Sequence, residues 1–237
     1  MRTAVSIARI LLLGWISLPL MATEVPSSAR AVQAEQRVRA DLDARLAMFG
    51  ARWGAPLYLR IFKQSRELEL WVRAGEGYQL FQTWPICTWS GSLGPKLQQG
   101  DWQAPEGFYT VAARQLNPVS RFHLAFNLGY PNAYDRAHGR TGDFLMVHGN
   151  CVSVGCYAMG DAAIEQIYTL VAAALAAGQK SVPVHIFPFR MDGDWASAYA
   201  DHEWLPFWRE LEPAYRGFVA GGTPPKVRVQ GKRYVVE

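Results

Sequence analysis

The chain has 237 residues, of which 50% are hydrophobic, 19% charged and 13% aromatic. A single domain usually holds about 100–200 residues, so the chain is long enough for one sizeable core with small additions, and its apolar content excludes a disordered or fibrous protein. The formal charge of +4 is spread along the chain without a Lys/Arg cluster, so we expect no nucleic-acid partner.

The N-terminus has the layout of a secretory signal peptide. Arg2 precedes an apolar run over residues 10–18, and Pro19 and Ala22 follow that run. The run is shorter than the ~20 residues needed to cross a bilayer, so cleavage after residues 1–22 is favoured over a retained membrane anchor. The mature chain is therefore expected in the periplasm, without a stable membrane span.

Residues 23–50 are expected to form an N-terminal helical segment. Its apolar side chains recur at steps of three or four residues, at Val38, Leu42, Leu46 and Phe49. This spacing is typical of one face of a helix over about 29–48.

Short strand candidates follow, the first of them with the alternating pattern typical of β-strands with one buried face. They lie at residues 57–62, 67–73, 78–81, 108–112, 122–126, 144–147 and 184–187. The Gly- and Pro-rich stretches 90–107 and 128–143 predict long loops, which often carry function.

Two helices and a tail complete the expected chain. Asp161 has the character of an N-cap for an apolar helix that closes at Gly178, and a second, aromatic-rich helical stretch covers about 195–218. Residues 219–237 are expected as a linker and a basic, strand-like tail that is either an edge strand or disordered. The pattern predicts an α+β protein that is mostly β, with attached helices.

One segment carries residues suited to nucleophilic chemistry. The strand predicted at 144–147 ends at His148, and Cys156 follows in a Gly-containing loop just before a helix. An imidazole that removes the thiol proton makes a cysteine a competent nucleophile. The backbone N–H groups of Gly155 and Cys156 could then stabilise an oxyanion.

Other uses of the same residues remain open from spacing alone. His148, Cys151 and Cys156 could bind zinc, although the segment offers no convincing fourth ligand. Cys151 and Cys156 could also be structural, either paired with each other or buried.

The chain has three cysteines, so at least one thiol stays unpaired within a monomer. We expect Cys87 to be buried as a small hydrophobe. A disulfide between Cys87 and Cys151, which leaves Cys156 free, is the alternative.

The segment resembles a known signature. His148-Gly149 followed by Ser153-Val154-Gly155-Cys156 resembles the HG…SHGC motif of L,D-transpeptidases, the YkuD-type catalytic domain, and the closer match is the YafK branch of that family. Further stretches that resemble this branch lie at residues 61–64, 85–96, 105–109, 116–118, 129–139, 156–159 and 184–191.

The resemblance implies a β-sandwich-like fold built around a mixed sheet, with a catalytic domain over residues 51–218. It also implies that Cys156 is the nucleophile and forms a thioester at the diaminopimelate of a peptidoglycan stem peptide. His148 would be the general base, and Gly155, Ser153 and Gly149 would shape the oxyanion-binding loop. No cofactor and no metal are expected.

Two positions differ from the common family pattern. Val154 stands where most members have histidine, and Ala158 stands where an arginine is common. At both positions the chain resembles the YafK branch. A member of that branch is associated with hydrolysis of the bond between diaminopimelate and the C-terminal lysine of an outer-membrane lipoprotein.

The loop before the predicted strand at 144–147 offers candidate substrate contacts. They are Tyr134, Asp135, Arg136, His138 and Arg140. Arg136 or Arg140 could bind a carboxylate, and Asp135 could bind the diaminopimelate amine or orient His148. Alternatively, these residues form a surface loop held by its own polar contacts, and the sequence favours neither interpretation.

The sequence therefore predicts a periplasmic cysteine enzyme that acts on peptidoglycan stem peptides. Hydrolysis of a protein–peptidoglycan link or a crosslink is favoured over bond formation, and a peptidoglycan-linked outer-membrane lipoprotein is an expected partner. The alternative is a catalytically silent peptidoglycan-binding module on the same fold.

Overall fold

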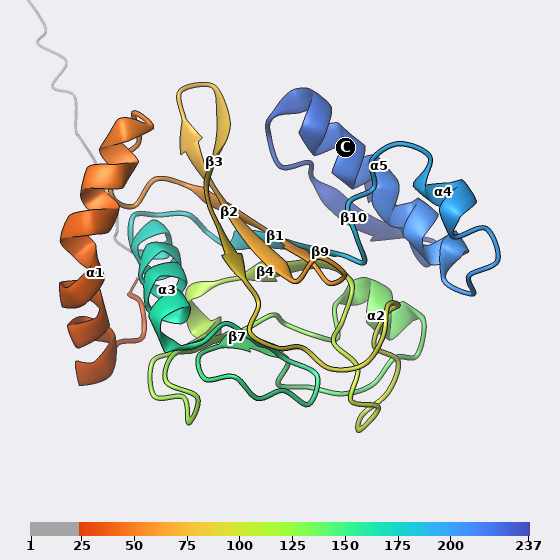
Figure 1. The fold of residues 1–237 in the computed structure, drawn as a ribbon, viewed down its shortest axis with the longest axis horizontal. Coiled ribbons are helices and arrows are strands. Elements are labelled where there is room, and N and C mark those ends of the chain that lie inside the picture. Colours follow the sequence, from red (N-terminus) through yellow and green to blue (C-terminus); the bar gives the residue numbers. More distant parts are fainter. Residues whose placement is uncertain (1–23) are drawn as a thin grey trace, which may run out of the picture.

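The computed structural model describes residues 24–237, so the expected signal peptide at 1–22 lies outside the described residues. The architecture is α+β with mixed sheets and flanking helices, as predicted (Figure 1). Within residues 24–237 no helix combines the length and the apolar character needed to cross a membrane.

The larger sheet has five strands in the order β3-β2-β1-β9-β4. These strands are β1 (Leu57–Phe62), β2 (Glu67–Ala74), β3 (Gly77–Pro85), β4 (Gly107–Val111) and β9 (Val182–Phe187). The central strand β1 pairs antiparallel with β2 and parallel with β9. All six β1 residues are buried because both faces of the sheet are covered.

A second sheet of four short strands carries the segment with His148 and Cys156. Its order is β5-β6-β7-β8, with β5 (Leu116–Asn117), β6 (Ala125–Asn127), β7 (Met146–His148) and β8 (Tyr157–Ala158). Strand β7 pairs antiparallel with β6 and parallel with β8.

Helices cover both sides of the larger sheet (Figure 1). They are α1 (Ala29–Met48), α2 (Ala133–Ala137), α3 (Asp161–Ala176), α4 (Trp195–Ala198) and α5 (Leu205–Gly221), with a short 3-10 turn at Ala113–Gln115. One core cluster joins both sheets to α1 and α3, and a second, aromatic cluster joins the larger sheet to α5 and the C-terminal hairpin.

The tail forms a hairpin of β10 (Val227–Gln230) and β11 (Arg233–Val236) that packs on the domain. The buried Tyr234 ring stacks on Tyr134 with centroids 4.1 Å apart, and Tyr234 Oη accepts a hydrogen bond of 3.0 Å from Asn132 Nδ2. A Cβ on Gly107 would lie 2.6 Å from that hydroxyl, so the contact requires glycine there. The predicted strand-like tail is therefore anchored to α2 and β4.

The predicted helix over 29–48 is confirmed, whereas some other boundaries shift. Strands β6 and β7 begin at Ala125 and Met146, because His123 and Phe144 have left-handed φ angles of 66° and 51°. The stretch 195–218 divides into α4 and α5, and proline in the first turn of α5 suits a new helix start.

The expected N-cap at Asp161 is wrong by one residue. Gly160, with φ 78°, is the N-cap, and Asp161 is the first helical residue of α3. Asp161 Oδ1 instead accepts a hydrogen bond of 2.7 Å from the backbone N–H of Asn150. The start of α3 is thus tied to the loop after His148.

Candidate active site

The second sheet holds His148 at the end of β7 and Cys156 directly before β8. Strands β7 and β8 pair parallel, with Val147 opposite Tyr157, so Met146 stands opposite Cys156. The Met146 N–H donates to Cys156 Sγ at 3.4 Å, consistent with that register. This register therefore sets Cys156 beside Met146, two residues before His148, and the described hydrogen-bond partners of the thiol are the Met146 N–H and the Phe144 carbonyl oxygen.

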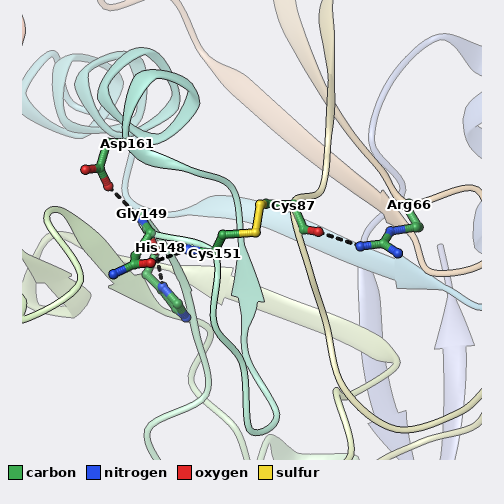
Figure 2. Close-up of a disulfide and its surroundings, with 7 residues drawn as sticks. Arg66, Cys87, His148, Gly149, Cys151 and Asp161 are labelled. Carbon is green, nitrogen blue, oxygen red and sulfur yellow. Dashed lines mark hydrogen bonds between the residues drawn. A yellow bond between two sulfur atoms is a disulfide. The ribbon is translucent and has the colours of Figure 1, made fainter.

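The hydrogen bond of His148 determines which ring nitrogen is free. Nδ1 lies 2.5 Å from the carbonyl oxygen of Gly149 (Figure 2). A carbonyl only accepts, so Nδ1 carries the hydrogen and Nε2 of the neutral ring is a proton acceptor. Burial lowers the pKa of His148, and the Gly149 carbonyl opposes that effect in part. The Phe122 ring, 4.7 Å away between centroids, covers the imidazole.

Cys156 is the free cysteine of the chain, and its thiol is half-buried. Burial raises the pKa of this thiol, while the Met146 N–H and the positive charge of Lys96 act in the opposite direction. The group is therefore a neutral thiol at neutral pH, and it needs a base before it can act as a nucleophile.

Ser153 fixes the loop that leads into Cys156. Its hydroxyl donates to the Cys156 carbonyl at 2.7 Å and accepts from the Gly155 N–H at 3.2 Å. Gly155 has φ 124°, a conformation that suits glycine. The Gly155 N–H is thus already engaged, whereas that of Cys156 has no protein acceptor within residues 24–237 and is free to bind an oxyanion.

The loop also requires glycine at position 149. A Cβ there would lie 2.6 Å from Asp161 Oδ1 and 2.8 Å from the carbonyl oxygen of Phe122. Because both neighbours are held in place, a side chain at Gly149 would displace the loop that orients His148.

A disulfide joins Cys87 to Cys151, with their Cα atoms 5.4 Å apart (Figure 2). The expectation that Cys87 is buried as a small hydrophobe is wrong, because this residue is exposed and follows the edge strand β3. The alternative pairing is confirmed and leaves Cys156 free. The same bond rules out the zinc interpretation with Cys151, and residues 24–237 contain no cluster of three potential metal ligands.

Removing the disulfide is expected to lower stability. It closes a loop of 64 residues in sequence, so the Cys87→Ala/Cys151→Ala variant should lose about 2–4 kcal/mol of unfolding free energy, because the unfolded chain is less constrained. Urea denaturation measures this loss, and non-reducing peptide mapping of the native protein should link the two cysteines. An unchanged denaturation midpoint, or a mapped bridge that contains Cys156, would contradict the assignment.

The candidate substrate residues divide into a structural and an exposed group. Asp135 is fully buried and accepts hydrogen bonds from Arg140 at 2.8 Å and from the Tyr109 hydroxyl at 3.0 Å. It also caps α2 by accepting from the backbone N–H of Asn132. The prediction that Asp135 and Arg140 face substrate is wrong, because their charges are buried against each other.

Tyr134 is likewise buried, between Tyr234 and the ring of His138. His138 is exposed, and its Nδ1 lies 3.0 Å from the Tyr134 carbonyl oxygen. Arg136 is exposed, and its guanidinium donates to the carbonyl of Pro131. Of the five candidates, only Arg136 lines the cavity described next.

A cavity of about 690 Å³ lies beside this loop. Neither Cys156 nor His148 lines it, and the residue that links it to the thiol is Phe144, which lines the cavity and whose carbonyl oxygen is 3.7 Å from Cys156 Sγ. Three charged side chains line it, namely Arg114, Arg136 and Asp143, and none of them forms an ion pair with another described residue.

A buried ion pair near the site was not predicted. Lys63 and Glu106 are both fully buried, 3.1 Å apart. Lys63 Nζ donates to the carbonyl oxygens of Ser92, Gly94 and Ala104 at 2.8, 2.9 and 3.0 Å. Burial lowers the pKa of Lys63, and Glu106 opposes that effect. The only sequence signal was a lysine directly after an apolar strand, which does not identify its partners.

This pair holds the loop that borders the thiol. Glu106 accepts from the Gly94 N–H at 2.7 Å and from Trp208 Nε1 at 2.8 Å, which links the loop to α5. The Tyr157 hydroxyl donates to the Pro105 carbonyl at 2.7 Å, so the residue after Cys156 is attached to the same loop.

Comparison with known proteins agrees with the motif. The family model for the YkuD L,D-transpeptidase catalytic domain matches residues 57–186. The chain is 50% identical over 183 residues to "Putative L,D-transpeptidase YafK" of Escherichia coli (strain K12), covering 77% of this chain and 74% of that protein. The same identity and coverage hold for the protein of that name in Escherichia coli O157:H7.

Solved structures with a similar fold include two bacterial proteins. The helical cell shape determining protein Pgp2 of Campylobacter jejuni is 22% identical with a TM-score of 0.45, and the match covers 62% of this chain and 55% of that one. Bd1075 of Bdellovibrio bacteriovorus is 21% identical with a TM-score of 0.39, covering 57% and 48%. The family model and the identity to YafK together show that the chain belongs to the L,D-transpeptidase family and carries its YkuD-type catalytic domain.

Proposed function

We propose that this protein is a cysteine enzyme that cleaves an amide bond at the diaminopimelate of peptidoglycan stem peptides. The observation that carries the proposal is the register of β7 and β8, which sets the half-buried free thiol of Cys156 beside Met146, two residues before His148, whose Nε2 is free. The periplasm, reached through a signal peptide at residues 1–22, is the proposed location.

The first half-reaction transfers the acyl group to the enzyme. His148 Nε2 takes the thiol proton as Sγ attacks the carbonyl carbon, and the Cys156 N–H stabilises the negative oxygen. The C–N bond then breaks, the leaving amine receives the proton from His148, and a thioester on Cys156 remains.

The second half-reaction releases the acyl group. His148 takes a proton from the incoming nucleophile, which attacks the thioester carbonyl; the C–S bond then breaks, and Sγ recovers the proton from His148 as the acyl group departs. Water gives hydrolysis of a protein–peptidoglycan link or a crosslink, and an amine gives transfer. We favour water, because Val154 and Ala158 follow the pattern of the branch associated with hydrolysis.

The charged cavity is the proposed binding site for the stem peptide. Two guanidinium groups and one carboxylate without ionic partners suit a ligand that carries both carboxylate and ammonium groups, as diaminopimelate does. Arg136 retains the role proposed from the sequence, and Arg114 and Asp143 join it.

Arg136→Ala should raise KM for a stem peptide about tenfold with a smaller change in kcat, because a charge-assisted hydrogen bond contributes about 1.5–3 kcal/mol. Steady-state kinetics on a purified tetrapeptide stem measures both constants. Arg121→Ala, at an exposed arginine outside the cavity, is the matched control. Equal KM values for the two variants would remove Arg136 from the binding site.

The proposed activity is tested on isolated sacculi that still carry covalently bound protein. Wild-type protein and Cys156→Ala are incubated with them, and the products are identified by mass spectrometry. Released protein or shortened stems with wild type alone support hydrolysis, whereas new diaminopimelate links would show transfer. Identical products from the two proteins would favour the silent binding module.

A further inference from the structure

Exposed large hydrophobic side chains gather around Cys156. Five of them lie on three loops, residues 94–103, 141–145 and 151–155, and we call them the apolar rim: Leu97, Trp102, Phe144, Val152 and Val154. Trp102, Phe144 and Val154 are each about two-thirds exposed, at 64%, 67% and 65%. The other exposed large hydrophobics of the described chain are scattered: Val32 and Met48 on α1, Leu80 on β3, Val119 between β5 and β6, and Val219 on α5.

All three loops border the thiol. The Phe144 carbonyl oxygen is 3.7 Å from Cys156 Sγ, and Val154 is two residues before Cys156 in the chain. A Cβ on Gly155 would lie 3.4 Å from the carbonyl oxygen of Gln103, the residue after Trp102. The Thr141 N–H donates to the Leu97 carbonyl at 2.9 Å, which joins the first two loops.

Two rim aromatics are held outward at a conformational cost. Trp102 and Phe144 have φ angles of 57° and 51°, in the left-handed region that bulky side chains rarely adopt. Such strain persists where surrounding contacts enforce it, often at functional sites.

For Trp102, the contacts that hold the loop converge on Asp101. Its carboxylate accepts from the backbone N–H groups of Leu97, Gln98 and Gln103 at 2.9, 3.0 and 3.0 Å, and it pairs with the buried Lys96. Burial raises the pKa of Asp101, but these hydrogen bonds outweigh it and hold the pKa below its usual value. An ionised carboxylate thus keeps the loop in the shape that exposes Trp102.

A substrate chain that continues from the scissile bond leaves the site past the loops that carry these side chains, because those loops border the nucleophile. Valine and leucine offer no polar partner, and a glycan laid on them would leave sugar hydroxyls without hydrogen bonds. A polypeptide with apolar side chains instead removes apolar surface from water on both partners. Aromatic residues are also enriched in the buried centres of protein–protein interfaces.

Building on the proposed function, we propose that the apolar rim binds apolar side chains of a polypeptide joined to the stem peptide at the scissile bond. The enzyme then distinguishes a protein-bearing stem from a bare one by contacts with Leu97, Trp102, Val152 and Val154 outside the charged cavity, while Phe144 belongs to both. The rim residues determine specificity and take no part in the proton transfers.

Three synthetic substrates with the same stem and the same scissile amide test this proposal. The leaving group is a single lysine, a short peptide that contains this lysine with leucine and valine residues, or the same peptide with serine in place of leucine and valine. The readout is the ratio of kcat/KM for each peptide-bearing substrate to kcat/KM for the lysine substrate.

For wild type, we expect a ratio of about ten or more with the leucine–valine peptide and a ratio near one with the serine peptide. Trp102→Asn and Val152→Ser should each lower the first ratio severalfold, and Val219→Ser on α5 is the matched control. Asparagine tolerates the left-handed backbone at position 102, and thermal unfolding verifies that each variant is folded.

Equal wild-type ratios for the two peptides, or unchanged ratios in both rim variants, would overturn the proposal. A rim effect seen only with a disaccharide-bearing stem would assign the rim to the glycan instead. If wild type cuts none of the substrates, the proposed function itself fails, which is a separate outcome.

Discussion

His148→Ala should lower kcat/KM on a stem-peptide substrate by about 10²–10⁴-fold, the range that general acid–base catalysis contributes. The reason is that burial holds the Cys156 thiol in its neutral form, so the proton has to be removed by Nε2 of His148. His202→Ala, at a histidine in the α4–α5 connection, is the control. Steady-state kinetics at neutral pH measures the difference.

The pH profile separates a base from a structural residue. Burial lowers the pKa of His148 from its usual 6.5, so wild-type kcat/KM should rise with pH, with an apparent pKa below 6.5, and then level off. In His148→Ala this rise of kcat/KM at acidic pH (the acidic limb of the profile) should disappear. Activity should instead increase with the thiolate fraction of Cys156 at alkaline pH. A variant that is slow but keeps the wild-type acidic limb would contradict the role of His148 as base.

Lys63→Met should be strongly destabilising, by about 3–5 kcal/mol of unfolding free energy. The substitution leaves Glu106 buried without its cation and also removes the donor to three backbone carbonyls. Urea denaturation followed by tryptophan fluorescence measures the loss, since Trp208 donates to Glu106.

The double variant Lys63→Met/Glu106→Gln is the matched control. It removes the uncompensated charge as well, so it should recover part of the stability that the single variant loses. If Lys63→Met unfolds at the same urea concentration as wild type, the Lys63–Glu106 ion pair does not hold the loop at residues 92–106.

Local patterns were enough to predict much of the fold. The helical period at Val38, Leu42 and Leu46 matches α1 from Ala29 to Met48, and alternation located the strands of the larger sheet. The predicted strand starts were wrong where the backbone turns left-handed, at His123 and Phe144, because the apolar residues typical of a strand continue through these turns.

The candidate site was predictable to the extent that its residues are close in sequence. His148, Ser153 and Cys156 lie within one segment, and the structure places them on adjoining parts of the second sheet. The roles of Asp135 and Arg140 were mistaken, because a charged pair in a loop gives no sign that it is buried.

Long-range partners could not be predicted from pattern. Lys63 and Glu106 are far apart in the chain, and only the packing of α5 and the loop over the sheet brings them together. The cavity charges at Arg114 and Asp143 could not be predicted for the same reason. Arg114 lies in the 3-10 turn and Asp143 in the loop before β7, and only the fold brings them to one cavity.

The central claim is that the substrate acyl group is carried on Cys156. Wild-type protein is mixed with a tetrapeptide stem, quenched in acid, and examined by intact mass and non-reducing peptide mapping. We expect an added acyl mass on the peptide that contains Cys156, removed by hydroxylamine and absent from Cys156→Ala. Product formation with no adduct at any time, or with an adduct on another residue, would contradict the account.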